Sequence, residues 1–207
     1  YAYFGYLAPL SIAHRGYSLE RIISQMSLAT EGIFGIPLGV SATFIVLLTI
    51  FGAILEASGA GKFYVDFALG CMGKSRAGAG RAVTLASFLL GTVSGSGAAT
   101  AVTLGSVAWP LLERSGYDRN SAGGLLAAGG IGAVLSPPVL GAASFLIAEI
   151  LRISYLEVLM MASIPTVLYY ASILFMVEGD ARKLHLQQVA LEKVDVGALA
   201  KQYWFHF

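Results

Sequence analysis

The sequence predicts an all-α polytopic membrane protein. Of its 207 residues, 57% are hydrophobic and only 12% are charged, whereas an average soluble domain is about 25% charged. Charged residues are also absent from four long windows, residues 32–55, 82–112, 120–148 and 158–177. A spanning helix needs about 20 predominantly apolar residues, and each window is long enough.

Composition also excludes several functional classes. The net charge of +1 gives no electrostatic footprint for nucleic acid, so we expect no nucleic-acid partner. The single cysteine, Cys71, excludes an intramolecular disulfide framework. The high hydrophobic fraction and the low charged fraction argue against a cytosolic enzyme. They imply a lipid bilayer as the partner.

The first part of the chain predicts a link, a span and a surface helix. Residues 1–31 begin in aromatic sequence, so we expect the end of an upstream span and an external link, in a fragment of a longer protein. Residues 32–57 indicate an ordinary transmembrane helix. Residues 58–81 predict an interfacial helix and a cytoplasmic loop, because segment 62–72 is amphipathic and too short to span.

Residues 82–112 predict a re-entrant hairpin. Their centre is the run Ser94-Gly95-Ser96-Gly97-Ala98-Ala99-Thr100, which is a poor helix and a good turn. Neither flanking half can cross about 30 Å of hydrocarbon at about 1.5 Å per residue. The alternative is one continuous span with a small-residue packing face. Cations flank both ends of the window, which favours the hairpin with both ends in the cytoplasm.

Residues 120–151 predict a discontinuous transmembrane helix. Ser136 is followed by Pro137 and Pro138, and adjacent prolines remove two backbone donors and push the preceding residue out of the helical region. We expect helical halves at 121–135 and 139–151. Free backbone groups within a membrane must be buried in protein or line a cavity, and two broken elements in one unit indicate a transporter site near the midplane.

The last part of the chain predicts a transmembrane helix at 157–178, then a cytoplasmic linker and the start of a next span at 179–207. Lys and Arg concentrate in residues 62–81 and in the tail. Cytoplasmic loops carry such an excess, so these segments are predicted to be cytoplasmic, and the N-terminal link and the turn at 152–157 external.

The two breaks indicate a site built from neutral groups. No window contains Asp, Glu, Lys, Arg or His, which argues against a proton relay inside the membrane. Na⁺ can be held by backbone carbonyls and hydroxyls, and half-helix N-termini can face a carboxylate. The alternative is that the hydroxyls bond carbonyls of their own helices and the glycines only allow close packing. The predicted substrate- and ion-binding residues are Ser94, Gly95, Ser96, Gly97, Thr100, Thr103, Ser136, Pro137 and Pro138; the Na⁺ candidates are Ser94, Ser96, Thr100 and Ser136.

Several motifs carry a family resemblance. The run SFLLGTVSGS at 87–96, with Gly105-Ser106, Pro110-Leu111 and the run RSGY at 114–117, resembles the large membrane subunit of TRAP (tripartite ATP-independent periplasmic) transporters. Residues 33–61 and 136–149 are similar to fused small-plus-large permeases of the TAXI-associated branch.

The resemblance implies an elevator-type secondary transporter with two inverted repeats, of which this chain is about the first and residues 32–57 a scaffold helix. It implies a sodium-coupled permease of a bacterial or archaeal cytoplasmic membrane that imports an organic acid. The implied partners are a periplasmic substrate-binding protein of TAXI type, a small membrane subunit (fused or separate) and the second half of the large subunit.

The chain departs from the family pattern at two places. Thr100 stands where many members have Asn, and residues 130–135 lack a polar run. A proton-coupled permease of the same family and a non-transporting half-permease scaffold therefore stay as alternatives.

Overall fold

The computed structural model describes residues 2–7, 9, 11–29, 32–72 and 75–187. All regular structure in this part of the chain is helical, which confirms the all-α class. After a 3-10 turn, η1, the helices follow in chain order, with η2 a π-helical segment: η1 (Gly5–Leu7), α1 (Leu19–Ser27), α2 (Ile36–Val40), η2 (Ser41–Ile45), α3 (Val46–Ala57), α4 (Ala60–Met72), α5 (Gly78–Ser94), α6 (Gly97–Arg114), α7 (Arg119–Ala133), α8 (Ala143–Leu151) and α9 (Tyr155–Lys183).

Polar residues at the helix starts explain several of these boundaries. Asp118 caps α7 by accepting from the backbone N–H groups of Asn120 and Ser121. Ser154 and Glu157 form a reciprocal capping box at the start of α9. Such caps satisfy backbone donors that have no partner within the helix, which favours helix starts at these points.

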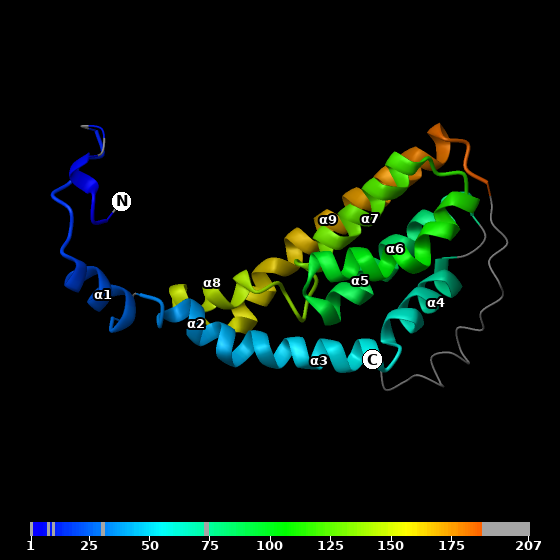
Figure 1. The fold of residues 1–207 in the computed structure, drawn as a ribbon. Helices are drawn as coiled ribbons and strands as arrows, with labels where there is room; N and C mark the ends of the chain where they lie inside the picture. The colour runs from blue at the N-terminus through cyan, green and yellow to red at the C-terminus, as the bar shows by residue number, and fades with distance from the viewer. Residues whose placement is uncertain (1, 8, 10, 30–31, 73–74, 188–207) are drawn as a thin grey trace.

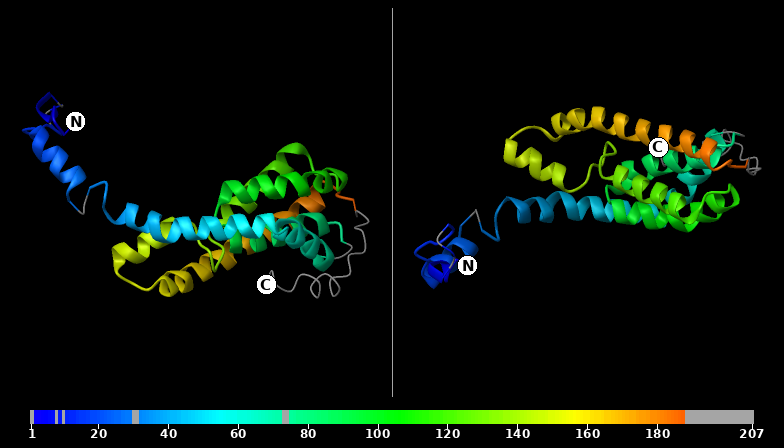
Figure 2. Two further views of the ribbon diagram at one scale, coloured as in Figure 1. Left: turned by 60° about the horizontal axis from the view of Figure 1, so that its bottom comes forward. Right: turned by 90° about the horizontal axis from the view of Figure 1, so that it is seen from above.

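The core lies among α4, α5, α6, α7 and α9, which pack side by side as a bundle (Figures 1 and 2). Leu104, Leu112 and Val177 are completely buried in it. Glycine brings α5 and α9 into close contact, because a Cβ added to Gly80 would lie 2.7 Å from a Val177 methyl carbon. The bundle therefore holds the hairpin and the first half of the broken helix as one packed unit.

Two helices in the described part of the chain are long and apolar enough to cross a membrane. One runs over Ile36–Ile54 and the other is α9. α9 exposes large apolar side chains along its length, with Ile164 70% and Phe175 77% exposed. A contiguous exposed apolar surface of this kind needs lipid or another protein surface to cover it.

Several boundaries differ from those expected. The two halves of the hairpin extend to Gly78 and Arg114. α8 begins at Ala143 instead of residue 139, because Leu140 N–H donates to Tyr155 and Gly141 N–H donates to Val134 O, which withdraws those groups from a helix. The depth of these elements in a membrane stays a prediction.

The surface helix expected within 58–81 is α4, and it is not a free surface element. Phe63, Tyr64, Val65 and Ala68 are buried, and α4 packs along α5. Of the segment expected at 179–207, the first residues continue α9 to Lys183, and residues 188–207 lie outside the described part.

Candidate functional site

The hairpin tip is a two-residue turn between α5 and α6. Gly95 has φ +56° and ends α5, its N–H donating to Gly91 O at 3.1 Å. Ser94 Oγ lies 3.3 Å from Ser96 N and 3.4 Å from Ser96 O. Ser96 Oγ accepts from Ala99 N–H at 3.5 Å and caps α6. Residues of the turn and of the adjoining helix ends therefore provide the hydrogen-bond partners of these backbone groups, as in an αL C-cap and a serine N-cap.

The break in the second element is the non-helical segment between α7 and α8, which we call the 134–142 break. The Pro137–Pro138 peptide bond within it is cis. Ser136 is completely buried; its Oγ lies 3.0 Å from Gly132 O and 3.0 Å from the Tyr170 hydroxyl. The break is therefore tied to α9 at this point.

Two further α9 side chains hold the same segment. The Thr166 hydroxyl lies 2.6 Å from Leu135 O. The Tyr155 hydroxyl donates to Pro138 O at 2.9 Å and accepts from Leu140 N–H at 3.1 Å. Backbone groups released by a helix break must be re-satisfied within a membrane, and α9 supplies the partners.

The hairpin tip and the 134–142 break lie against each other. A Cβ added to Gly95 would lie 3.0 Å from Val139 O and 3.2 Å from Leu140 O. Added to Gly130, it would lie 2.6 Å from Gly97 O. The two breaks, which the sequence places in separate windows, are thus in direct contact, and only glycine permits that approach.

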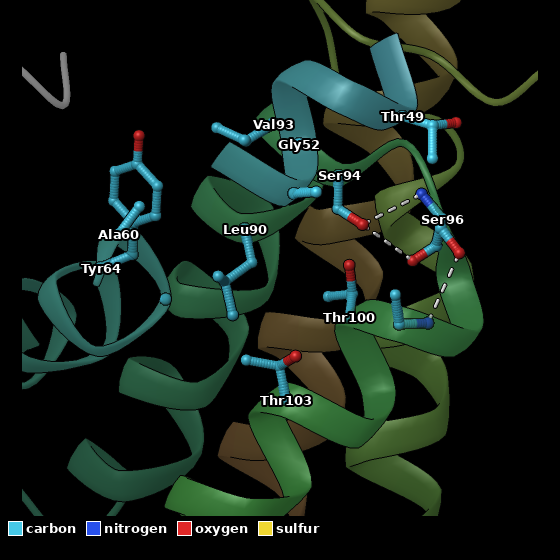
Figure 3. A pocket seen from close by; sticks show the side chains of 13 residues that line it. Thr49, Gly52, Ala60, Tyr64, Leu90, Val93, Ser94, Ser96, Thr100 and Thr103 are labelled. Carbon is cyan, nitrogen blue, oxygen red and sulfur yellow. Dashed lines mark hydrogen bonds between the residues drawn. The ribbon is translucent and has the colours of Figure 1, made fainter. Parts of the chain in front are cut away.

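A cavity of about 350 Å³ opens beside the hairpin tip, between it and helices α3 and α4. Figure 3 shows the hydroxyls of Ser94, Ser96 and Thr100 at the hairpin end of this cavity. Its lining contains no Asp, Glu, Lys, Arg or His among the described residues: Thr49, Gly52, Ala53, Ala60, Gly61, Tyr64, Leu90, Val93, Ser94, Ser96, Ala99, Thr100 and Thr103.

Thr100 is the unusual member of this lining. It is 2% exposed, and its Oγ1 has no hydrogen-bond partner among the described residues. Leaving a buried hydroxyl unsatisfied costs about 1–3 kcal/mol. Such a group in a native structure calls for an explanation such as an ion or a water, and here it borders a cavity.

The structure brings most of the predicted site residues together. Ser94, Ser96, Thr100 and Thr103 line the cavity. Gly95 touches the 134–142 break and Gly97 packs on α7 at Gly130. The remaining predicted residues, Ser136, Pro137 and Pro138, lie within the break, and the Ser136 hydroxyl points to Tyr170 instead of the cavity.

Sequence reasoning missed the α9 residues that hold the break. Tyr155, Thr166 and Tyr170 fall within or beside the last charge-free window. Their spacings, 11 and then 4 residues, correspond to about three turns and one turn of helix, which places them along one face. A search of that window and of the residues just before it for hydroxyls at helical spacing would have found them.

The other end of the bundle carries the charges. Arg81 of α5 and Glu178 of α9 form an ion pair. Tyr117, in the link between α6 and α7, is buried, and burial, then the charges of Asp180 and Glu178, raise its pKa to about 12. This ion pair and Tyr117 therefore lie apart from the cavity at the hairpin tip, whose described lining includes none of them.

Comparison with known proteins gives one family and several relatives. The sequence matches the family described as "Tripartite ATP-independent periplasmic transporter, DctM component" over residues 3–206. It is 36% identical over 87 residues to the C4-dicarboxylate TRAP transporter large permease protein DctM of Pseudomonas aeruginosa, covering 42% of this chain and 20% of the relative.

Two further relatives are also TRAP transporter large permease proteins by name. The 2,3-diketo-L-gulonate TRAP transporter large permease protein YiaN of Escherichia coli is 33% identical over 87 residues, again 42% of this chain and 20% of the relative. A putative TRAP transporter large permease protein of Haemophilus influenzae is 24% identical over 135 residues, 65% of this chain and 31% of the relative. The chain thus spans about a fifth to a third of the length of the curated relatives it matches.

Proposed function

The chain belongs to the DctM component family of tripartite ATP-independent periplasmic transporters, and from that premise we propose that it is part of a secondary-transporter permease that imports an organic acid. We propose that the permease lies in the inner membrane and uses a sodium gradient. The relatives are named for C4-dicarboxylate and 2,3-diketo-L-gulonate transport, and both substrates carry carboxylates, which supports an organic acid as the substrate class.

The observation that carries the sodium proposal is the buried Thr100 hydroxyl beside the cavity at the hairpin tip, which has no hydrogen-bond partner among the described residues. Ser94 and Ser96 supply further oxygens there, and the described part of the lining holds no carboxylate and no cationic side chain. Transporters of this general kind coordinate Na⁺ with hydroxyls and the backbone carbonyls of broken helices. Neutral oxygens can bind Na⁺, and hydroxyls do not ionise at physiological pH to hold a coupled proton.

The N-terminus of α6 supports binding of the carboxylate. α6 begins at Gly97, next to the cavity, and runs to Arg114. Its first N–H groups carry partial positive charge, so the substrate anion can be stabilised without a buried cation. The bound Na⁺ would add to this attraction, which couples the two ligands electrostatically.

The transport cycle is proposed to follow the elevator scheme. The unit that moves would contain the hairpin α5–α6 and the broken helix α7–α8, and the helix over Ile36–Ile54 would belong to the scaffold. The packing of α5, α6 and α7 into one bundle supports a unit that moves as a rigid body. The proposed partners are a periplasmic binding protein of TAXI type, a small membrane subunit and the second half of the large subunit.

The test is transport by the complete permease in proteoliposomes, with its binding protein loaded with a carboxylate that stabilises that protein in a thermal-shift screen. We expect uptake when an inward Na⁺ gradient is imposed, and none when choline replaces Na⁺. Equal uptake under both conditions would overturn sodium coupling. Uptake driven by an imposed pH gradient without Na⁺ would replace it with proton coupling.

A further inference from the structure

Tyr155, the first residue of α9, bonds both a donor and an acceptor of the 134–142 break. Its hydroxyl donates to Pro138 O at 2.9 Å and accepts from Leu140 N–H at 3.1 Å. A single side chain therefore satisfies two backbone groups that the break has released. Each bond fixes the orientation of one peptide plane, and the two planes flank Val139.

Ring stacking holds Tyr155 itself in place. Its ring stacks on Phe145 of α8 with centroids 4.5 Å apart and planes 2° from parallel. Phe145 stacks in turn on Phe44 of η2, at 5.4 Å and 10°. Stacked aromatic pairs contribute beyond their buried area, so the Tyr155 hydroxyl is presented to the break by three elements at once.

The peptide planes that Tyr155 holds belong to the part of the break that meets the hairpin tip. Val139 O and Leu140 O approach Gly95, lying 3.0 and 3.2 Å from the position of an added Cβ. Neither carbonyl accepts a hydrogen bond from a described residue. These are oxygens of the kind that broken helices offer to Na⁺. Val139 O shares its peptide plane with the Leu140 N–H that Tyr155 binds, whereas the plane of Leu140 O is held by Gly141 N–H on Val134 O.

We infer that Tyr155 is a positioning residue for the ion site, holding the two peptide planes on either side of Val139 so that the Val139 carbonyl faces the hairpin tip. The inference rests on the proposed sodium site. It assigns a role to a residue outside both breaks that does not line the cavity at the hairpin tip.

The experiment is a Na⁺ titration of the unfolding temperature of the complete permease in detergent, with choline chloride holding ionic strength constant. A ligand that binds the native state raises this temperature in a saturable manner. Tyr155→Phe keeps the ring stack and removes both hydrogen bonds. We expect its half-saturating Na⁺ concentration to rise about fivefold. This corresponds to a loss of binding free energy about equal to the net contribution of one hydrogen bond.

The matched control is Tyr169→Phe, which removes a hydroxyl of the same helix that donates to Ala128 O within α7 at 2.8 Å. We expect it to lower the unfolding temperature without changing the Na⁺ midpoint. An amber-suppressed p-aminophenylalanine at position 155, which can donate to Pro138 O, should restore part of the affinity and keeps the test available if Tyr155→Phe fails to fold.

The outcomes separate the two claims. An unchanged Na⁺ midpoint in Tyr155→Phe, or one no better with p-aminophenylalanine than with phenylalanine, overturns the positioning role while leaving the sodium site. A wild-type permease whose unfolding temperature does not respond to Na⁺ overturns the sodium site itself.

Discussion

The hairpin tip and the 134–142 break satisfy their backbone hydrogen-bonding groups in different ways. Both interrupt a helix and release backbone groups. At the tip, Ser94, Gly95 and Ser96 satisfy the turn with bonds that span at most four residues. At the break, the partners are Tyr155, Thr166 and Tyr170, between 15 and 34 residues away.

The difference shows where each break derives its shape. The tip is a local structure that needs packing only to be held against its neighbour. The break adds to its local bonds, such as Gly141 N–H to Val134 O, a set of partners on α9, so its backbone would change if α9 moved relative to α7. In a transporter, the first kind of break suits a fixed binding element and the second suits one that responds to the position of a neighbouring helix.

The largest effect is expected where the two breaks touch. Gly95→Val puts a β-branched residue at φ +56° and a Cβ 3.0 Å from Val139 O. The left-handed conformation and the overpacking together cost about 2–4 kcal/mol, which reduces the correctly formed contact by more than about 30-fold. We expect transport in proteoliposomes to be abolished while membrane insertion persists.

Gly124→Val is the matched control, because an added Cβ at Gly124 meets nothing within 4 Å in the described structure. Its transport should stay close to wild type. Normal transport by Gly95→Val would mean that the tip and the break need not touch, and the comparison between them would lose its functional meaning.

Sequence predicted the fold well where the signals were local. The run at 94–100 was predicted as the turn of the hairpin, and the structure places the turn at Gly95 and Ser96 within it, because αL glycine and serine caps are local chemistry. The prolines at 137 and 138 located the break but not its length. That length depends on Tyr155 and Val134 bonding Leu140 and Gly141, contacts that no local pattern specifies.

The candidate site was predicted in part for the same reason. The hydroxyls of the tip were predicted and line one cavity, because they follow each other along one turn. Ser136 was predicted as an ion ligand, yet its hydroxyl is engaged by Gly132 O and Tyr170. Which way a side chain points from a non-helical segment is decided by tertiary packing, so sequence alone could not separate Ser136 from Thr100.

The Thr100 hydroxyl tests whether the hairpin tip is the binding element, and the expected effect is smaller than that of Gly95→Val. Thr100→Val removes a hydroxyl that has no partner in the described part of the chain and keeps the shape of the side chain. Removing an unsatisfied buried hydroxyl should leave the sodium-free protein as stable as the wild type or about 1 kcal/mol more stable. The half-saturating Na⁺ concentration should rise about tenfold, since a ligand oxygen is lost.

Thr84→Val provides the control for this substitution. Thr84 is also buried in the hairpin, but its hydroxyl donates to Gly80 O at 2.8 Å. It should be destabilised by about 1 kcal/mol with an unchanged Na⁺ midpoint. A Thr100→Val permease that loses stability and keeps its Na⁺ affinity would show that the hydroxyl serves packing alone.

The smallest effect concerns the pair that ties the break to α9. Ser136 and Tyr170 are bonded at 3.0 Å, and Ser136→Ala with Tyr170→Phe forms a double-mutant cycle. We expect a coupling energy of about 1 kcal/mol in the free energy of unfolding, measured by denaturation in mixed micelles. Each single variant should shift the Na⁺ midpoint little, because the Ser136 hydroxyl is turned toward Tyr170 and not toward the cavity. A tenfold loss of Na⁺ affinity in Ser136→Ala alone would instead make Ser136 an ion ligand, and the break would then be a binding element as direct as the tip.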